Sequence, residues 1–472
     1  MGVKEVDALL AQAEALDKAA KPGPPLAASA LTALPPRRGS FAPGAVGPRT
    51  TSPGRGTRCR WDGVRSIAWG LLLFACAAAP LPAAQSIIDQ LKEKDVAATS
   101  SRYNFSGSTD IRFSDGGHDV TPFNFNNQDD TGGVSTFTAL RMHLFLDATL
   151  SERTTIFVKV GGGALDQARL TLDALAITTK LGDGWPNLEV GRFLSPFGKF
   201  SQRFLGPDNP LIGEPLIYTY ATSLSTSQVP ANAVDLLSQR GRGTRSQFLG
   251  YPAQVRGQSL QSNVWYLNGA KLGGVADKLS YAVAVTNDAI SASELFDSND
   301  NKAVTMHLGY KPDIAWQIGC SASTSAYLNR RIHDNPVALG VKLGDFVQDS
   351  LGVDLDYASG PFSLFAEYIH NGWRTPFVGE DLKTHGFFIE PRFKVAPGIS
   401  LVARYDALWF SDLTIGGIAT PWEFDVSRLE LGVDYNIERD LLVKASYQFN
   451  RTDSPAGDPD DNLVQLQLVG VF

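Results

Sequence analysis

The feature that most constrains this chain is a period-two alternation of apolar and polar side chains between residues 102 and 472. Successive side chains of a β-strand point to opposite sides, so such alternation predicts strands with one apolar and one polar face. In the stretch 441–450 the apolar set is Leu441, Val443, Ala445, Tyr447 and Phe449, and Lys444, Ser446, Gln448 and Asn450 stand between them. The stretches 351–357, 401–409 and 429–435 alternate in the same way.

The length of these stretches and their connectors indicate how the strands are arranged. Strands of about 9–11 residues cross a bilayer when tilted, whereas strands of globular proteins usually have about 5–6. Short connectors are expected at 151–154, 182–186, 273–278, 311–312, 359–360, 395–398 and 437–440. Long connectors are expected at 114–134, 161–168, 196–261, 287–301, 324–347, 372–383, 410–424 and 451–461. Seven short and eight long connectors separate sixteen strands; eighteen is the alternative if 246–256 holds a further strand pair.

The predicted fold class is all-β: a closed antiparallel transmembrane β-barrel over residues 102–472, with short periplasmic turns and long extracellular loops. After Gln85 no window offers eighteen consecutive apolar residues, so a transmembrane helix bundle is excluded. In lipid every backbone polar group needs a partner within the protein, and a closed sheet satisfies that need without long apolar helices.

Composition excludes several other classes. An aromatic content of 10% and 43% hydrophobic residues argue against disorder. Three cysteines do not make a disulfide scaffold, and a net charge of -7 argues against nucleic acid as a partner.

The N-terminal part has the pattern of a secretion signal. Arg58, Arg60 and Arg65 precede an uncharged run at 67–82, and small residues follow up to Ala84. We therefore predict a signal peptide at 57–84 and a short periplasmic segment at 85–101. Residues 1–56 are interpreted as a disordered or mis-started extension, with a docked N-terminal helix as the alternative.

The C-terminal strand alternates as well and ends on an aromatic residue. Val464, Leu466, Leu468, Gly470 and Phe472 share one face. An alternating last strand with a terminal Phe resembles the signal by which the outer-membrane assembly machinery selects its substrates. Phe472 is the candidate signal, and the predicted location is the outer membrane of a Gram-negative bacterium.

A family resemblance rests on the run LEVGRFLSPFG at 188–198. Gly191, Pro196, Phe197 and Gly198 resemble the Gly-x-x-x-x-Pro-Phe-Gly element of the phosphate-selective porins O and P and their relatives, in which a strand leads into a long third loop. The resemblance implies a sixteen-stranded porin, passive diffusion of small hydrophilic solutes or ions, anions such as phosphate among them, and a homotrimer. The arginine ladder and lysine cluster expected of phosphate-selective members are not found in this sequence, so phosphate selectivity is not carried over.

Strand parity projects charged residues of both signs onto the lumen wall. The basic candidates are Arg141, Lys159, Arg392, Arg404, Arg428 and Lys444, and the acidic candidates are Glu189, Asp354, Asp356 and Glu367. A mixed wall suits a general porin or a cation-leaning channel better than a strict anion filter.

The long loop at 196–261 is expected to fold inward and constrict the pore. Candidate constriction residues are Arg203 and the basic run Arg240, Arg242 and Arg245, whose guanidinium groups suit carboxylate and phosphate. The alternative for the basic run is an exposed loop tip beside lipopolysaccharide phosphates. Membrane lipid and lipopolysaccharide are therefore expected partners.

The tryptophans near strand ends predict an interfacial aromatic girdle, with sugar stacking as the alternative for some of them. These are Trp265, Trp316, Trp373, Trp409 and Trp422.

No motif for covalent or metal chemistry was found. The six histidines are scattered, no Gly-x-Ser-x-Gly elbow occurs, and no Cys-x-x-Cys or His-Glu-x-x-His is present. No catalytic residue, metal or cofactor is therefore predicted. Two alternatives to a free channel are a barrel that sheathes an electron-transfer or export partner and an outer-membrane barrel enzyme; a soluble all-β binding protein is a third.

Overall fold

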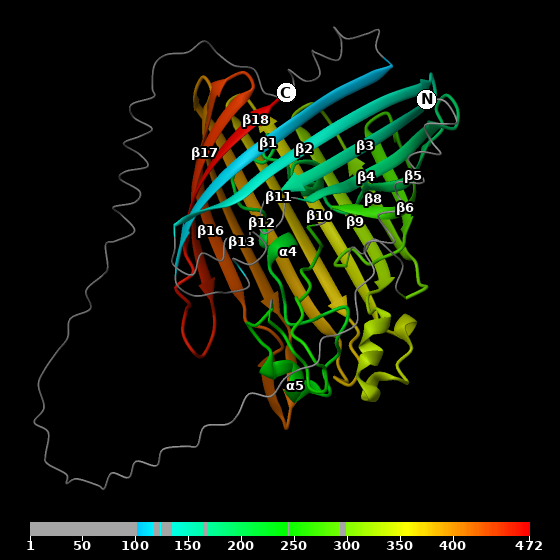
Figure 1. Ribbon diagram of the computed structural model, residues 1–472, viewed down its shortest axis with the longest axis vertical. Helices are drawn as coiled ribbons and strands as arrows, with labels where there is room; N and C mark the ends of the chain where they lie inside the picture. The colour runs from blue at the N-terminus through cyan, green and yellow to red at the C-terminus, as the bar shows by residue number, and fades with distance from the viewer. Residues whose placement is uncertain are drawn as a thin grey trace, which may run out of the picture. The chain divides into compact units, whose positions relative to one another are not determined.

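The computed structural model describes residues 102–117, 123, 135–163, 169–243, 245–263, 265–292 and 299–472. Within these ranges, sixteen strands form one closed antiparallel barrel, and β1 pairs with the last strand, β18, to close it (Figure 1). The predicted segments 1–56, 57–84 and 85–101 lie outside the described residues.

The strands of the barrel range from 8 to 16 residues. They are β1 (Tyr103–Gly116), β2 (Thr136–Ser151), β3 (Thr154–Gly163), β4 (Arg169–Lys180), β5 (Asn187–Leu194), β6 (Tyr266–Ala276), β7 (Leu279–Thr286), β8 (Ala303–Tyr310), β9 (Trp316–Ala326), β10 (Val347–Ser359), β11 (Phe362–Trp373), β12 (Leu382–Ala396), β13 (Ile399–Phe410), β16 (Val426–Glu438), β17 (Leu441–Thr452) and β18 (Leu463–Val471).

The prediction of a closed antiparallel barrel of sixteen strands is confirmed. The alternative of eighteen strands is wrong, because 246–256 holds only an isolated bridge between Ser246 and Val255. An extra strand pair does exist, but β14 (Asp412–Ile415) and β15 (Ile418–Pro421) form a separate hairpin in the loop between β13 and β16.

The short helices all lie in loops. They are η2 (Phe200–Gln202), α4 (Leu216–Thr219), α5 (Ala233–Ser238), η3 (Arg330–Asp334), η4 (Pro336–Ala338) and η5 (Leu343–Asp345). Among the described residues, no helix has both the length and the apolar character needed to cross a membrane.

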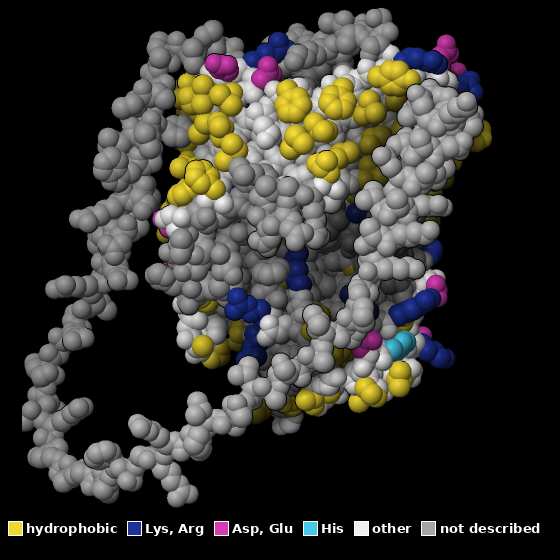
Figure 2. Space-filling view, in the orientation of Figure 1, with side chains coloured by type: hydrophobic (Ala, Val, Ile, Leu, Met, Phe, Trp, Pro, Cys, Tyr) yellow, Lys and Arg dark blue, Asp and Glu magenta, His cyan; other side chains and the backbone are white. Residues whose placement is uncertain are grey.

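The two faces of the strands differ as the alternation predicts. On β13, Leu401, Tyr405 and Trp409 are 52%, 43% and 45% exposed, whereas Arg404 and Asp406 between them are fully buried. Figure 2 shows apolar side chains gathered on the outer surface of the strands in the upper part of the view. The barrel therefore has an apolar outside and a polar inner wall, the reverse of a soluble sheet packed on a core.

The interior of the barrel is largely occupied by the segment between β5 and β6. We call residues 195–265 the inner loop. Its Leu216, Ile217 and Tyr218, in α4, are buried in a core cluster with Ile369, Phe388 and Leu408 of the barrel strands. A Cβ added at Gly386 of β12 would lie 2.8 Å from the Ile217 side chain and 3.0 Å from that of Leu260, so the loop packs directly on the wall.

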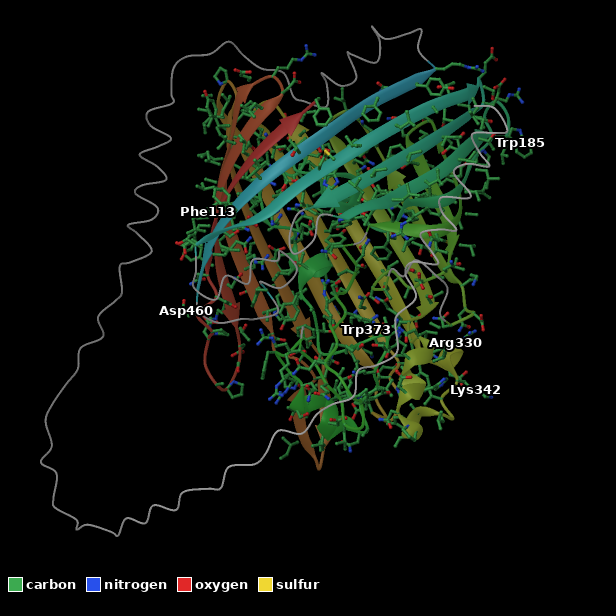
Figure 3. All side chains as sticks on the ribbon, viewed as in Figure 1. Phe113, Trp185, Arg330, Lys342, Trp373 and Asp460 are labelled. Atoms are coloured by element: carbon green, nitrogen blue, oxygen red, sulfur yellow. The ribbon has the colours of Figure 1, made fainter. Side chains whose placement is uncertain are left out.

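Three of the five tryptophans predicted for the girdle lie inside instead. Trp265 is 6% exposed, and Trp373 and Trp422 are fully buried, with their rings 5.9 Å apart. In Figure 3 Trp373 lies within the barrel, whereas Trp185 marks the short-turn end and Arg330 and Lys342 mark a long loop at the other end. The girdle prediction is wrong for these three, because their rings complete the core cluster between the inner loop and the wall. Trp316 and Trp409 are exposed on the outer face.

The chain ends inside the sheet ladder. The Phe472 backbone N–H donates to the Gly107 carbonyl (3.0 Å), and the Gly107 N–H donates to the Phe472 carbonyl (2.7 Å). A Cβ at position 107 would lie 2.5 Å from the Phe472 ring. Glycine at 107 thus makes room for the terminal aromatic side chain where the barrel closes.

Gly191, the first residue of the porin-like element, has a backbone reason to be glycine. Its φ is +129°, and an added Cβ would lie 2.2 Å from the Leu175 carbonyl oxygen on β4. Only glycine combines this φ with such a close approach of two strands.

We expect Gly191→Ala to destabilise the folded barrel by about 1–3 kcal/mol, the usual cost of a strained backbone position. The measurement is the denaturant midpoint of the refolded protein, followed by tryptophan fluorescence. Gly372→Ala in β11 is the matched control, because an added Cβ there meets no atom within 4 Å. Equal midpoints for the two variants would contradict the assignment.

Candidate functional site

The ten charged wall residues predicted from strand parity all point to the interior of the barrel. Arg141, Lys159, Asp356 and Arg392 line cavities, and Glu189 pairs with Lys271 at 2.7 Å beside the inward Phe193. Asp354 is 2% exposed and faces His307 at 3.7 Å. The other four, Glu367, Arg404, Arg428 and Lys444, are buried beneath the inner loop.

Glu367 of β11 holds the start of the inner loop. One carboxylate oxygen accepts the backbone N–H groups of Lys199 (2.5 Å) and Phe200 (2.6 Å), and the other accepts the Tyr218 hydroxyl (2.5 Å). A single side chain therefore fixes two separate parts of the loop, η2 and α4, against the same strand.

Arg404 of β13 lies at the centre of a buried charge network. Its guanidinium contacts Glu390 (3.1 Å), Asp406 (3.3 Å) and Glu430 (2.5 Å), and all four residues are fully buried. Arg203 of the inner loop also pairs with Glu390. Burying charges is tolerated only when they are paired and hydrogen-bonded, and one arginine here neutralises part of a three-carboxylate set.

The carboxylates of this network also bind loop backbone. Asp406 accepts the Leu216 N–H at 3.0 Å, and Glu430 accepts the Gly213 N–H at 3.0 Å. These donors belong to the segment that enters α4, and the first N–H groups of a helix have no partner within the helix. The wall thus supplies acceptors that the loop's secondary structure lacks.

Cations of the wall bind loop carbonyls. Lys444 of β17 donates to the carbonyls of Gly206, Asn209 and Leu211. Arg112 of β1 donates to the Ile212 carbonyl (3.3 Å), and Arg428 of β16 donates to the Glu214 carbonyl (3.4 Å). Carboxylates hold N–H groups and cations hold carbonyls, so the loop backbone is fixed on several sides.

These contacts correct the prediction of the wall. Glu367, Arg404, Arg428 and Lys444 were expected to face the water of the lumen, but the inner loop covers all four. Strand parity identifies the inward face, and it carries no information about what lies against that face.

Two cavities lined by residues that the structure describes lie beside the inner loop. The first, of about 450 Å³, lies toward the short turns and is lined by Lys199, Gln202, Arg203, Pro207, Asp208, Asn209, Pro210, Asp356, Phe365, Arg392, Asp434, Asn436 and Leu442. The second, of about 260 Å³, lies against β1 to β4 and is lined by Asp110, Arg112, Arg141, His143, Lys159, Asp173, Phe204, Leu205, Gly206, Asn209, Leu211, Ile212, Glu214, Asn263, Trp265, Tyr266 and Gln467.

Each cavity presents charges of both signs. Three basic and three acidic side chains line the first cavity, and the second has three Lys or Arg and three Asp or Glu together with His143. In the second cavity Arg141 pairs with Asp110 and Lys159 pairs with Asp173, both at 3.2 Å. The lining offers no excess of fixed charge that would exclude ions of one sign.

Asp208 is the loop carboxyl in the first cavity. Burial raises its pKa to about 6, although the nearby Lys444 and Arg203 cations oppose the rise. Burial also raises the pKa of Glu214 in the second cavity, against the effect of Arg141 and Arg112.

The predicted constriction residues do not come together. Arg203 lines the first cavity, with its guanidinium 3.6 Å from the centre of the Phe365 ring. Arg240 donates to the Pro421 carbonyl (3.1 Å) and lies over the Phe424 ring, beside the β14–β15 hairpin, and Arg242 and Arg245 are exposed. Neither of these two cavities is lined by the basic run, and its expected role in a constriction stays a prediction. The run follows α5, which Figure 1 shows at the long-loop end.

Sequence reasoning missed three residues that line a cavity or bind the inner loop. Asp208 lines the first cavity and belongs to no sequence motif. Glu423 is a loop residue that accepts the N–H groups of Ser223 (2.8 Å) and Gly241 (2.5 Å). Trp265 lines the second cavity with a φ of +61° and stacks on Phe204 at 4.9 Å. A positive φ at a non-glycine residue is a property of the folded backbone and leaves no signal in the sequence.

Within the described part of the chain, no group of three or more His, Cys, Asp or Glu residues is arranged to hold a metal ion.

Comparison with known proteins gives structural likenesses only. No family model matches the chain, and no curated protein matches it. An outer membrane protein OmpT of Vibrio cholerae, in a trimer form, is 12% identical with a TM-score of 0.48, over 78% of this chain and 99% of that chain. The anion-selective porin from Comamonas acidovorans is 12% identical with a TM-score of 0.49, over 78% and 99% of the two chains. The outer membrane channel DcaP of Acinetobacter baumannii is 12% identical with a TM-score of 0.48, over 78% and 97%.

TM-scores below 0.5 carry no conclusion about what this chain transports. The functional assignment therefore depends on the barrel's own residues.

We expect Glu367→Ala to loosen the start of the inner loop while the barrel stays closed. The backbone N–H groups of Lys199 and Phe200 lose their acceptor, which costs about 1–3 kcal/mol for each buried donor, equivalent to roughly ten- to a hundredfold faster exchange. Amide hydrogen exchange of residues 199–218 is the measurement. Asp349→Ala is the matched control, because Asp349 contacts Thr324 and Arg374 on the outer face. Unchanged exchange in Glu367→Ala would show that the carboxylate does not hold the loop.

Proposed function

We propose that the chain is an outer-membrane porin through which small hydrophilic solutes and ions diffuse passively. The single observation that carries the proposal is a closed barrel, apolar outside and polar inside, whose inner loop lies beside cavities that described residues line with charges of both signs.

The outer surface supports a place in a membrane. Leu351 and Val353 on β10 are 60% and 52% exposed, and Leu429 and Leu431 on β16 are 38% and 44% exposed. In water such exposure would cost roughly 25 cal/mol for each Å² of apolar surface, whereas lipid removes that cost. The closed ladder leaves no unpaired strand edge, which a bilayer requires.

The filled interior argues against the sheath alternative. The inner loop and its core cluster occupy the space that a partner protein would need. The enzyme alternative has no supporting constellation among the described residues, and several interior charges, such as Lys159, Arg404 and Glu367, are held by each other or by loop backbone.

The balanced lining favours weak ion selectivity over a phosphate filter. Every cation in the second cavity has a carboxylate in the same lining, and Arg141 and Lys159 are already paired. The exposed side chains of Arg242 and Arg245, beside the partly buried Arg240, suit lipopolysaccharide phosphate at the outer rim better than a role in the path.

Two further parts of the proposal concern assembly. Phe472 completes the seam between β18 and β1, which supports its role as the signal read by the outer-membrane assembly machinery. A homotrimer is proposed from the resemblance of the 188–198 element alone.

We expect weak selectivity in planar bilayers under a potassium chloride gradient. Arg141→Gln should shift the reversal potential toward cations and Asp173→Asn toward anions. One charge at about 4 Å in water is worth about 1 kcal/mol, so the permeability ratio should change by up to about fivefold. Arg374→Gln, outside the cavities, is the control. If the folded wild type forms no channels, the porin proposal is refuted. If all variants have the same reversal potential, the second cavity does not lie on the path of the ions.

We also expect the selectivity to depend on pH near 6. Because burial raises the pKa of Asp208 to about 6, the carboxyl is charged above that pH and neutral below it. Lowering the pH from about 8 to about 5 should therefore remove one negative charge from the first cavity and shift the reversal potential toward anions. At both pH values, Asp208→Asn should show the ion selectivity that the wild type shows at the lower pH. A pH-dependent shift that persists in this variant would assign it to another group.

A further inference from the structure

Two histidines face each other on the outer surface of the barrel. His370 of β11 and His385 of β12 are direct cross-strand partners. Their neighbours on the same face, Leu351 of β10 and Trp409 of β13, are 60% and 45% exposed, so the pair points away from the lumen. The transport proposal makes no use of these two residues.

We propose that His370 and His385 form a binding site for a divalent transition-metal ion such as Cu²⁺, Ni²⁺ or Zn²⁺. Imidazole nitrogen is a preferred ligand of these ions, whereas Ca²⁺ and Mg²⁺ prefer oxygen. The two rings come from adjacent strands of a rigid sheet, so binding does not have to order a flexible segment.

The ring spacing fits a shared ion. A metal bound to an imidazole nitrogen at about 2.0–2.1 Å lies about 3.2 Å from the ring centroid, so two rings sharing an ion at roughly 90–110° have centroids about 4.5–5.2 Å apart. The observed centroids of His370 and His385 are 4.6 Å apart.

The hydrogen bonding of the two rings leaves nitrogens for the metal. Tyr368 bonds His385 at Nδ1 through its hydroxyl (2.6 Å), which directs Nε2 of that ring to the ion when Nδ1 carries the proton. Nδ1 of His370 is buried against its neighbours and has no hydrogen-bond partner among the described residues, so this nitrogen is not committed to a protein group.

The pair lies near the long-loop end of its strands, and His385 is exposed there. His370 and His385 each lie three residues from the long-loop end of their strand, where β11 ends at Trp373 and β12 begins at Leu382. Trp409 beside His385 is exposed at the same level, which is typical of the interfacial zone. Lys383 is also exposed nearby, and its positive charge together with only two protein ligands weakens the binding of a cation.

The test is Cu²⁺ binding to the untagged, refolded full-length barrel, measured by calorimetry and by electron paramagnetic resonance. The wild type should bind one ion at this site with superhyperfine coupling to two imidazole nitrogens. His370→Ala and His385→Ala should each bind roughly 10²–10⁴-fold more weakly, because the second ligand no longer acts at high effective concentration. Tyr368→Phe should weaken binding by about tenfold.

His333→Ala is the matched control, because its ring contacts the Val341 carbonyl in a loop and should leave binding unchanged. Heat-modifiable gel mobility establishes that each variant is folded; where an alanine variant does not fold, the glutamine variant at the same position replaces it. Wild-type affinity and a two-nitrogen signal in either histidine variant would overturn the proposal, as would a wild type that binds none of the three ions up to millimolar concentration.

Discussion

The interaction on which the rest of the structure depends is the binding of the inner-loop backbone by charged side chains of the barrel wall. Glu367, Asp406 and Glu430 accept loop N–H groups, and Lys444 accompanies them by donating to loop carbonyls. A long loop inside a barrel carries many backbone polar groups away from bulk water, and each unpaired group would cost free energy. The wall charges meet this need and thereby determine where the loop lies.

This arrangement explains how the barrel interior is both charged and narrow. On the side of β11 to β13 the loop packs Leu216 and Ile217 against Phe388 and Leu408, and this side is closed by an apolar core. On the side of β1 to β4 the ion pairs Arg141–Asp110 and Lys159–Asp173 stay beside a cavity. Any path for a solute is therefore limited to the part of the barrel's cross-section that the loop does not fill. That part is lined by charges of both signs.

The candidate site was predictable only in part. Alternation placed Arg404 and Lys444 on the inward face, because strand parity is a local property of the backbone. It did not reveal that Arg404 is surrounded by Glu390, Asp406 and Glu430, since these residues come from three strands whose register is set by the closed ladder. The position of Arg240 likewise depends on a contact with a residue far away in the sequence, Pro421.

The sequence by itself determined the barrel: period-two alternation, strand length and the alternation of short and long connectors predict a closed antiparallel barrel of sixteen strands, with eighteen left open by residues 246–256. Strand faces and hairpin connections can be predicted in this way because they depend on residues close together in the chain. Only the tertiary structure decided which charges remain beside water, that Trp373 and Trp422 lie inside, and that His370 stands opposite His385. These outcomes depend on how a loop of irregular structure packs and on which residues the register brings together. No local pattern encodes a contact between residues that meet only after the ring has closed.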